Sequence, residues 1–236
     1  MNVKKSVFLS AAVFLMTSGA FAAQRSGFST FLDRVHTMVG GTEAEAPKPR
    51  RPSVKPEVIL KMDQGNISYI YRNKIVQCGG GTAAGCTNSE IFMEPLLLDF
   101  NAQGEISKIH LTLGIENLWV EVSTEYPKGS CQFDVVLKHE LTHVAFARSA
   151  LARYGPAMAR AIVLEAEKLP VPITQESYNR LVDIANRYFT QMVQEKTRQD
   201  DLLDSQGNNS YQWEQCAAVR GPDGQVRERK FYRRRR

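Results

Sequence analysis

Residues 135–146 read VVLKHELTHVAF, and this stretch decides how the rest of the chain is interpreted. Its two histidines, His139 and His143, are half of the four in the sequence. A helix places residues four apart on one face, one turn from each other. Apolar residues flank the histidines on their own face and also cover the opposite face. Because a helix that is apolar on both sides lies inside a fold, we predict a central helix with both imidazoles in the interior.

The HExxH spacing has a specific chemical meaning. Two imidazole nitrogens on one helix face can take adjacent corners of a tetrahedral zinc. Glu140 lies about 100° further around the helix, where it can reach a water on the metal without ligating the metal. Buried histidines satisfied by protein partners alone are the alternative. We predict that His139 and His143 bind Zn²⁺ and that Glu140 is the general base.

A catalytic zinc site needs a third protein ligand and leaves its fourth position to water. No histidine follows His143, so the third ligand is expected to be a carboxylate. Gly155-Pro156 predicts a turn between two antiparallel helices, and a residue about 10–12 positions beyond that turn would return to the level of His143. Glu165 falls in this window on the predicted inward stripe and is our choice. Glu167, Asp183 and Asp204 are further candidates.

The segments on either side of the motif differ in character. From about residue 56 to 125, short runs of β-branched and aromatic residues are separated by turn signals such as DQGN and NAQGE, which is typical of strands. After Cys131, apolar residues recur at helical spacing in three predicted helices, divided at Gly155-Pro156 and at Pro170. Strands followed by helices predict an α+β fold. We expect a mainly antiparallel or mixed sheet, then the HExxH helix and two further helices.

The chain divides into four predicted parts. Residues 1–22 combine a basic start, an apolar run and small residues at a cleavage site, as a signal peptide does. Residues 23–55 contain a proline-rich linker, with a propeptide as an open alternative. Residues 56–220 form the compact domain, and residues 221–236 form a basic tail. No later stretch is long and apolar enough to span a membrane, so we predict a secreted or periplasmic bacterial protein.

The formal net charge of +5 is carried by the two ends of the chain. Without Lys4 and Lys5 of the signal it is +3, and without the tail RERKFYRRRR, whose seven basic residues face Glu228 alone, it is −3. The body is therefore slightly acidic, and the tail is expected to be solvated. Because basic and aromatic residues do not interleave, specific nucleic-acid binding is not expected.

The four cysteines of an exported chain are expected to form two disulfides. Of the three pairings, we favour Cys78–Cys86, which closes the loop CGGGTAAGC, with Cys131–Cys216, which ties the C-terminal segment to the start of the histidine helix. A zinc site of four thiolates is disfavoured because no CxxC pair is present. The glycine-rich loop lacks the Lys-Ser/Thr of a phosphate-binding loop.

HELTH, with a strand before it and a helical carboxylate after it, resembles the zincin clan of metallopeptidases, in particular its glutamate-ligand (gluzincin) branch. VEVSTEYPKGSCQFDVVLKHELTHV is similar to small secreted bacterial zincin-like proteins of unassigned substrate, where a Ser-Cys pair precedes the helix as Ser130-Cys131 does here. The resemblance covers about residues 117–168. It does not extend to the metzincin pattern, since Phe146 stands in place of its glycine. It implies that the two histidines are ligands and that the glutamate between them is the base.

The resemblance also implies a role for LWVEVSTEY, residues 118–126. In zincins the strand before the active helix is an edge strand that can pair with an extended peptide substrate. An interior strand is the alternative for this segment. Tyr126 is a candidate donor to the developing oxyanion, with simple packing as its alternative. His36 and His110 stand alone and are expected to pack or to lie at the surface.

These observations predict an exported zinc-dependent hydrolase, most directly a metallopeptidase acting on a peptide or protein substrate, which includes cell-envelope substrates. Zn²⁺ is the one cofactor expected. The alternative is a disulfide-stapled envelope protein with a structural or vestigial zinc site, which acts by binding a partner. Glu140→Gln separates the two hypotheses, because only a hydrolase needs the base.

Overall fold

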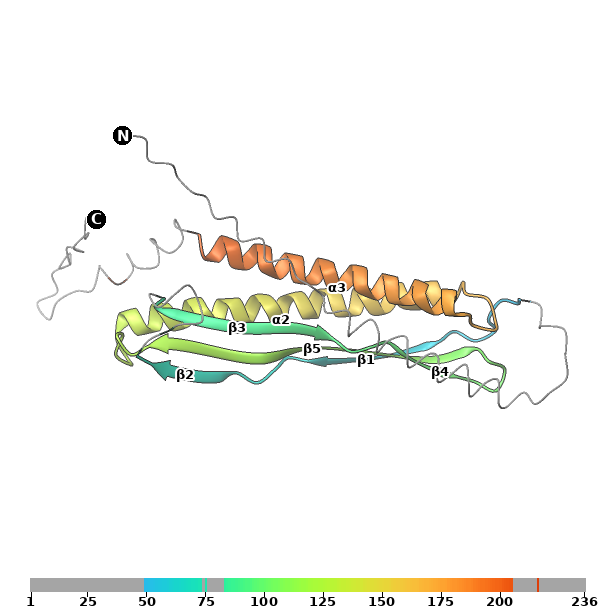
Figure 1. The fold of residues 1–236 in the computed structure, drawn as a ribbon, viewed down its shortest axis with the longest axis horizontal. Coiled ribbons are helices and arrows are strands. Elements are labelled where there is room, and N and C mark those ends of the chain that lie inside the picture. The colour runs from blue at the N-terminus through green and yellow to red at the C-terminus, as the bar shows by residue number, and fades with distance from the viewer. Residues whose placement is uncertain (1–48, 74, 76–82, 206–215, 217–236) are drawn as a thin grey trace, which may run out of the picture. The chain divides into compact units, whose positions relative to one another are not determined.

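The structure is a computed structural model that describes residues 49–73, 75, 83–205 and 216. Five strands precede two helices, which confirms the predicted α+β class (Figure 1). The predicted signal peptide, nearly all of the 23–55 segment and the basic tail lie outside the described residues. The elements are β1 Glu57–Asp63, β2 Ser68–Arg72, β3 Gly85–Met93, β4 Leu97–Phe100, β5 Ile106–Ser123, α2 Cys131–Ala166 and α3 Gln175–Leu203.

The sheet is built around β5, with which each of the other four described strands pairs. β1 and β2 pair with it in parallel, and β3 and β4 pair with it antiparallel. Gly114 pairs with Asp63 of β1 and with Phe92 of β3, so those two strands lie on opposite edges of β5. The same overlap at Val120 puts β2 opposite β3. The sheet is therefore mixed, and the predicted predominance of antiparallel pairs is not found.

The segment 118–126 had two alternatives, an edge strand and an interior strand. Its residues 119–122 lie in β5, with β2 along one side and β3 along the other. Their backbone groups are engaged on both edges, so no peptide can pair with them. Of the two alternatives, the structure contains the interior strand. β3 contacts the histidine helix through Thr87, whose hydroxyl donates to the backbone carbonyl of Glu140 at 3.0 Å.

A bulge lets β5 keep one face on the core over its 18 residues. Ile115 and Leu118 are both buried although they are three positions apart, a spacing that puts side chains on opposite faces of a regular strand. Between them Asn117 has φ 49°, in the left-handed region, and the pairing register with β3 shifts there. The Asn88 amide donates to the Asn117 carbonyl at 2.9 Å and holds this conformation.

The helix that carries the histidines is longer than predicted. Ser130 caps its N-terminus by accepting from the backbone N–H of Phe133 at 3.2 Å. The helix then continues through Pro156 to Ala166, so the predicted break is wrong. An internal proline costs about 3 kcal/mol. Burial of Leu151 and Met158 on either side of it contributes about 1.5–3 kcal/mol each, which is enough to offset that cost.

α3 runs back along α2 and brings its C-terminal end beside the start of the histidine helix (Figure 1). Thr174 caps its N-terminus by accepting from the Ser177 N–H at 3.2 Å. Tyr178 donates from its hydroxyl to the carbonyl of Leu96 at 3.0 Å, which ties this end of α3 to the link between β3 and β4. Most of the predicted second helix thus belongs to α2, and α3 corresponds to the predicted third helix. Neither described helix has an apolar stretch sufficient to cross a membrane.

The described domain starts earlier than the predicted boundary at residue 56. Arg50 pairs with the carboxylate of Glu105, and Ser53 donates its backbone N–H to the same carboxylate at 3.1 Å. Asn101 donates a further hydrogen bond at 3.0 Å. Glu105 is fully buried, and these hydrogen bonds, that of the Ser53 backbone foremost, lower its pKa to about 2. Part of the segment assigned to the linker is thus anchored to the domain.

Candidate metal centre

His139 and His143 present their Nε2 atoms to each other across one turn of α2. The two nitrogens are 3.3 Å apart, and the rings are nearly perpendicular, with an interplanar angle of 76°. The side chains keep only 13% and 11% of their surface exposed. The predicted helix, the shared face and the burial of both imidazoles therefore agree with the structure.

Asp204 completes a group of three from the other helix. It is the C-cap residue of α3, and its Oδ1 lies 3.0 Å from Nε2 of His139 and 3.1 Å from Nε2 of His143. The three side chains form the one group of at least three His, Cys, Asp or Glu residues within the described residues that could hold a metal ion. Asp204 is thus the candidate third ligand that the structure brings to the histidines.

A second carboxylate of α3 orients the His143 ring. Asp200 accepts from Nδ1 of His143 at 2.7 Å, so that nitrogen carries a proton. In the neutral ring, Nε2 then carries a lone pair directed at the carboxylate oxygen of Asp204 and at Nε2 of His139. Two lone pairs 3.1 Å apart repel unless a proton or a cation lies between them. The arrangement suits a positive ion.

Glu140 lies under β3, next to the three-residue group. Its Oε2 accepts from the hydroxyl of Thr87 at 2.8 Å, and the residue is 5% exposed. Gly85 allows this approach, because a Cβ there would lie 2.5 Å from Oε1 of Glu140. α2 can pack this closely against the start of β3 because Gly85 has no side chain.

The environment shifts the pKa of several groups in the centre. Burial raises the pKa of Glu140, and the charge of Asp204 adds to this, against the hydrogen bond from Thr87 and the charges of both histidines. Burial lowers the pKa of His143, but the hydrogen bond to Asp200 and the nearby carboxylates outweigh it, so that the net pKa is raised. Burial raises the pKa of Asp200, but the hydrogen bonds to His143 and Lys196 outweigh it, so that the net pKa is lowered.

Glu165, the carboxylate predicted as the third ligand, does not approach the histidines. It lies on the same unbroken helix, 22 residues beyond His143, which is about 33 Å along the axis. Its carboxylate pairs instead with Arg180, and with Lys168 at 3.4 Å. The prediction of Glu165 depends on a turn at Gly155-Pro156 that the structure does not contain.

Glu167 and Asp183, two further candidates for the third ligand, also lie away from the histidines. Glu167 pairs with Lys55 at 3.0 Å, and Asp183 is exposed on α3. Tyr126 packs at the border of the core, where its backbone carbonyl accepts from the Tyr71 hydroxyl at 2.8 Å, and its oxyanion role stays a prediction.

Asp200 is not among the residues predicted from the sequence. The signal for it is local: Asp200 and Asp204 stand four apart, which mirrors the spacing of the two histidines. Two carboxylates on one face of a helix can complete a metal site with two histidines of a neighbouring helix. The sequence alone does not show that these two helices are neighbours. Lys196, one more turn back, lies 2.7 Å from the second oxygen of Asp200.

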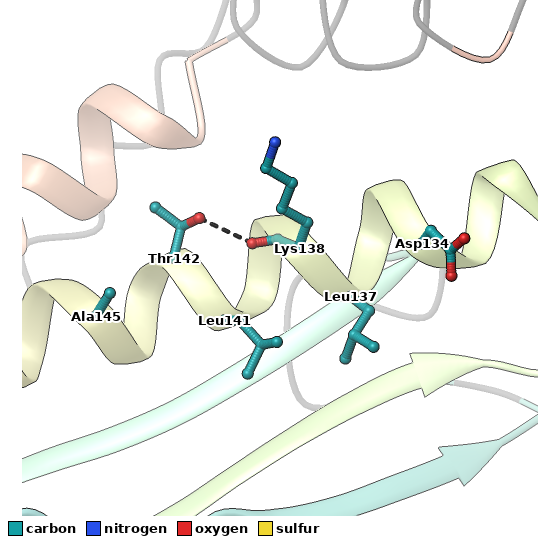
Figure 2. A pocket seen from close by; sticks show the side chains of 6 residues that line it. All are labelled: Asp134, Leu137, Lys138, Leu141, Thr142 and Ala145. Atoms are coloured by element: carbon teal, nitrogen blue, oxygen red, sulfur yellow. Dashed lines mark hydrogen bonds between the residues drawn. The ribbon is translucent and has the colours of Figure 1, made fainter.

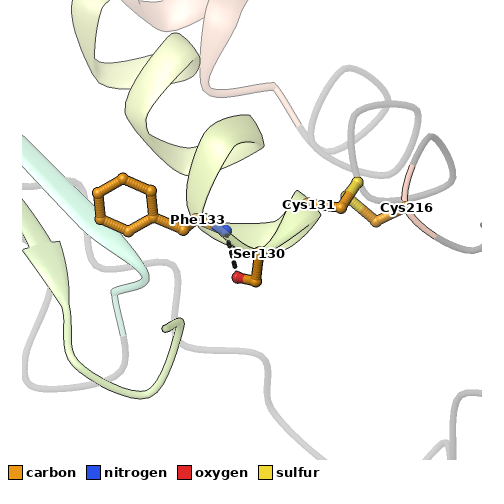
Figure 3. The surroundings of a disulfide bond; sticks show 4 residues. All are labelled: Ser130, Cys131, Phe133 and Cys216. Carbon is orange, nitrogen blue, oxygen red and sulfur yellow. Dashed lines mark hydrogen bonds between the residues drawn. A yellow bond between two sulfur atoms is a disulfide. The ribbon is translucent and has the colours of Figure 1, made fainter. Parts of the chain in front are cut away.

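The disulfide between Cys131 and Cys216 is present and confirms that predicted pairing (Figure 3). It joins the first residue of α2 to a residue 12 positions beyond Asp204. The bond therefore ties the start of the histidine helix to a residue of the chain that follows α3. Cys86 is disulfide-bonded as well, and its predicted partner Cys78 lies outside the described residues.

A shallow groove on α2 lies away from this centre (Figure 2). Successive residues of a helix are about 100° apart, so the groove is centred about 150° around α2 from the histidines. We therefore assign no part of the metal centre to it. The groove is lined by Asp134, Leu137, Lys138, Leu141, Thr142 and Ala145.

Comparison with known proteins provides no relative. No family model, no curated protein and no solved structure matches this chain. The centre is therefore defined by its own geometry, and the resemblance to zincins stays a prediction from the sequence.

Proposed function

We propose that this protein is a zinc-dependent hydrolase whose metal is held by His139, His143 and Asp204. The observation that carries the proposal is the convergence of three donor atoms from two helices, at mutual distances of 3.0, 3.1 and 3.3 Å. Ligands bound to tetrahedral zinc at 2.0–2.1 Å are separated by roughly 3.3 Å. The three atoms thus have the dimensions of one face of a zinc coordination tetrahedron.

The chemistry of the donors also favours zinc. Two neutral imidazoles and one carboxylate form a set typical of catalytic zinc sites, which keep the fourth position for water or substrate. Sites for Mg²⁺ and Ca²⁺ consist of oxygen ligands, so two nitrogens argue against them. The half-exposed Asp204 lies on the solvent side of the group, which gives a substrate access to it.

Zinc bound at such a site lowers the pKa of a coordinated water toward neutrality and polarises a substrate carbonyl. Glu140 supplies the proton transfer. Its side chain is held by the hydrogen bond from the Thr87 hydroxyl to Oε2, and in this proposal its carboxylate would take a proton from the attacking water and pass it to the leaving group. We propose an amide of a peptide or protein as the substrate, as the resemblance to metallopeptidases implies.

Export is part of the proposal. The Cys131–Cys216 disulfide supports it, because disulfides persist in oxidising compartments outside the cytoplasm. A role at the cell envelope would follow from the predicted signal peptide.

One observation favours the second candidate, a metal that serves structure alone. Glu140 is 5% exposed and hydrogen-bonded to β3, a position in which it can act as a structural link between α2 and the sheet. A structural metal would crosslink α2 and α3 without any need for a base.

Glu140→Gln separates the two candidates. The purified protein would be loaded with zinc and assayed on a library of quenched fluorescent peptides, with the metal content measured in parallel. For the hydrolase we expect cleavage by the wild type, a loss of at least about 100-fold in the variant, and an unchanged metal content. Glu195→Gln, also on α3 but at a carboxylate paired with Arg198 and Gln199, is the matched control and should cleave normally. Zinc binding without cleavage by the wild type would support the structural site instead.

A further inference from the structure

We propose that Asp200 is a positioning residue that fixes His143 as a metal ligand, and that Lys196 holds Asp200 in place. The inference rests on the proposed metal site, and it adds to that site a part that the HExxH motif does not contain. It concerns the orientation of one imidazole and not the chemistry of the reaction.

The contacts form a continuous chain through partly buried groups. Nδ1 of His143 donates to Oδ1 of Asp200 at 2.7 Å, and Oδ2 of Asp200 accepts from Nζ of Lys196 at 2.7 Å. The side chains are 11%, 18% and 18% exposed, in that order. Both oxygens of Asp200 are thus engaged by different partners, which leaves the carboxylate little freedom to rotate.

The hydrogen bond from Nδ1 selects one tautomer of the ring. An aspartate carboxylate only accepts, so the proton of neutral His143 must be on Nδ1 and the lone pair on Nε2. Nε2 is the atom that faces Nε2 of His139 and Oδ1 of Asp204. The other tautomer would direct an N–H at the metal position and prevent ligation. A carboxylate on the remote nitrogen also makes the ligating nitrogen more basic.

Helix geometry explains how one element supplies all of these groups. Lys196, Asp200 and Asp204 are spaced by four residues, so they form one stripe along the last turns of α3. The stripe covers about 12 Å and faces the histidine turn of α2. It presents the third ligand, the carboxylate that orients the second ligand, and the cation that pairs with that carboxylate. A shift of α3 by one residue would remove all three together.

The test compares three variants of the full mature chain. Asp200→Asn keeps the shape of the side chain and removes its charge, and Lys196→Met removes the cation. Glu195→Gln is the matched control, because Glu195 pairs with Arg198 at 3.0 Å on the same helix and has no contact with His143. Zinc affinity would be measured by competition with a chromophoric chelator. The protonated nitrogen of His143 would be identified by ¹⁵N NMR of the metal-free wild type, followed over about pH 7–10 and interpreted where the ring is neutral, because the pKa of His143 is raised.

We expect Nδ1 to be the protonated nitrogen of His143 in the wild type. Asp200→Asn should lower zinc affinity about 10- to 100-fold, Lys196→Met should lower it by a smaller factor, and Glu195→Gln should not change it. Circular dichroism would show whether each variant keeps its helices. If Asp200→Asn does not fold, the wild-type tautomer and Lys196→Met decide.

Two results would overturn the role of Asp200: a proton on Nε2 of His143, or wild-type zinc affinity in a folded Asp200→Asn. A wild type that does not bind zinc would instead overturn the proposed function. The tautomer of the metal-free protein would still decide whether Asp200 positions the ring, so the two failures are distinguishable.

Discussion

Oδ1 of Asp204 lies 3.0 Å from Nε2 of His139, although 65 positions separate the two residues in the sequence. The contact exists because α2 is unbroken and α3 runs back along it, so that the end of one helix meets the beginning of the other. A site assembled in this way depends on the whole length of both helices. It has one half in the HExxH motif and the other half in the acidic end of α3.

Asp204→Ala should lower zinc affinity by at least about 100-fold, because it removes one of the three proposed ligands. The loss should exceed that from Asp200→Asn, since Asp200 contacts a ligand and not the metal. Glu165→Ala is the control, since it removes a carboxylate that lies about 33 Å along the helix. It should leave affinity unchanged. Competition with a chelator measures both variants, and equal affinities for the wild type and Asp204→Ala would refute the assignment of this ligand.

The sequence predicts the local half of this site well and the distant half poorly. The helix at His139, its start near Cys131 and the pairing Cys131–Cys216 follow from spacing and from residue type. Whether Gly155-Pro156 ends a helix depends on its surroundings, because a helix can continue through a proline when the flanking side chains are buried. The identity of the third ligand depends in turn on whether the helix ends there. The sheet has the same limit: the centre of β5 reads as a gap between two strands, whereas a bulge at Asn117 keeps one strand continuous.

Pro156 and Gly155 should respond differently to replacement by alanine. Pro156→Ala restores a helical N–H and removes the clash of the ring with the preceding turn, so we expect a gain of about 1–3 kcal/mol in the free energy of unfolding. Gly155→Ala would place a Cβ 2.8 Å from Sδ of Met62, a flexible side chain that is 38% exposed, and 3.4 Å from Leu113. The displacement of Met62 should offset the gain of about 0.5–1 kcal/mol in helix propensity, so we expect a net change below about 1 kcal/mol. Urea denaturation monitored by circular dichroism measures both variants. A gain from Gly155→Ala as large as that from Pro156→Ala would contradict the close contact of α2 with β1.

Gly85→Ala should disturb Glu140 without changing the ligands. The added Cβ would lie 2.5 Å from Oε1 of Glu140 and 2.6 Å from Val136, which are contacts that force the side chains to move. We expect a loss of about 1–3 kcal/mol in stability and a loss of hydrolysis, with zinc affinity retained. Gly104→Ala is the control: nothing lies within 4 Å of its Cβ, and its φ of 73° costs about 1 kcal/mol. If hydrolysis is normal in Gly85→Ala, Glu140 is not the base.

Removal of the Cys131–Cys216 disulfide should destabilise the fold mainly through the unfolded chain. The bond closes a loop with a sequence separation of 85, for which loss of loop entropy corresponds to about 4.6 kcal/mol. The double variant Cys131→Ala with Cys216→Ala should show this loss in urea denaturation, together with a larger dependence on urea concentration, because its unfolded state is more expanded. Zinc affinity should also fall, since Asp204 is 12 residues from the crosslink. A loss below about 1 kcal/mol would show that packing alone holds α3 on α2.

Stability should decrease in acid through Glu105. Its pKa is lowered from 4.5 to about 2 in the folded protein, chiefly by the backbone N–H of Ser53 and by Asn101 and Arg50. A lowered pKa means that the folded state prefers the carboxylate, so the stabilisation is complete above pH 4.5 and is lost as the pH falls toward 2. Glu105→Gln cannot ionise, and the difference in melting temperature between it and the wild type should therefore shrink over this range. Glu195→Gln is the matched control, because the pKa of Glu195 is also about 2 but its side chain is 21% exposed, against 1% for Glu105. About 1 M salt should remove most of the pH-dependent difference in melting temperature for Glu195→Gln and should leave that for Glu105→Gln, because Glu105 is buried. Equal salt sensitivity of the two variants would contradict the role of burial.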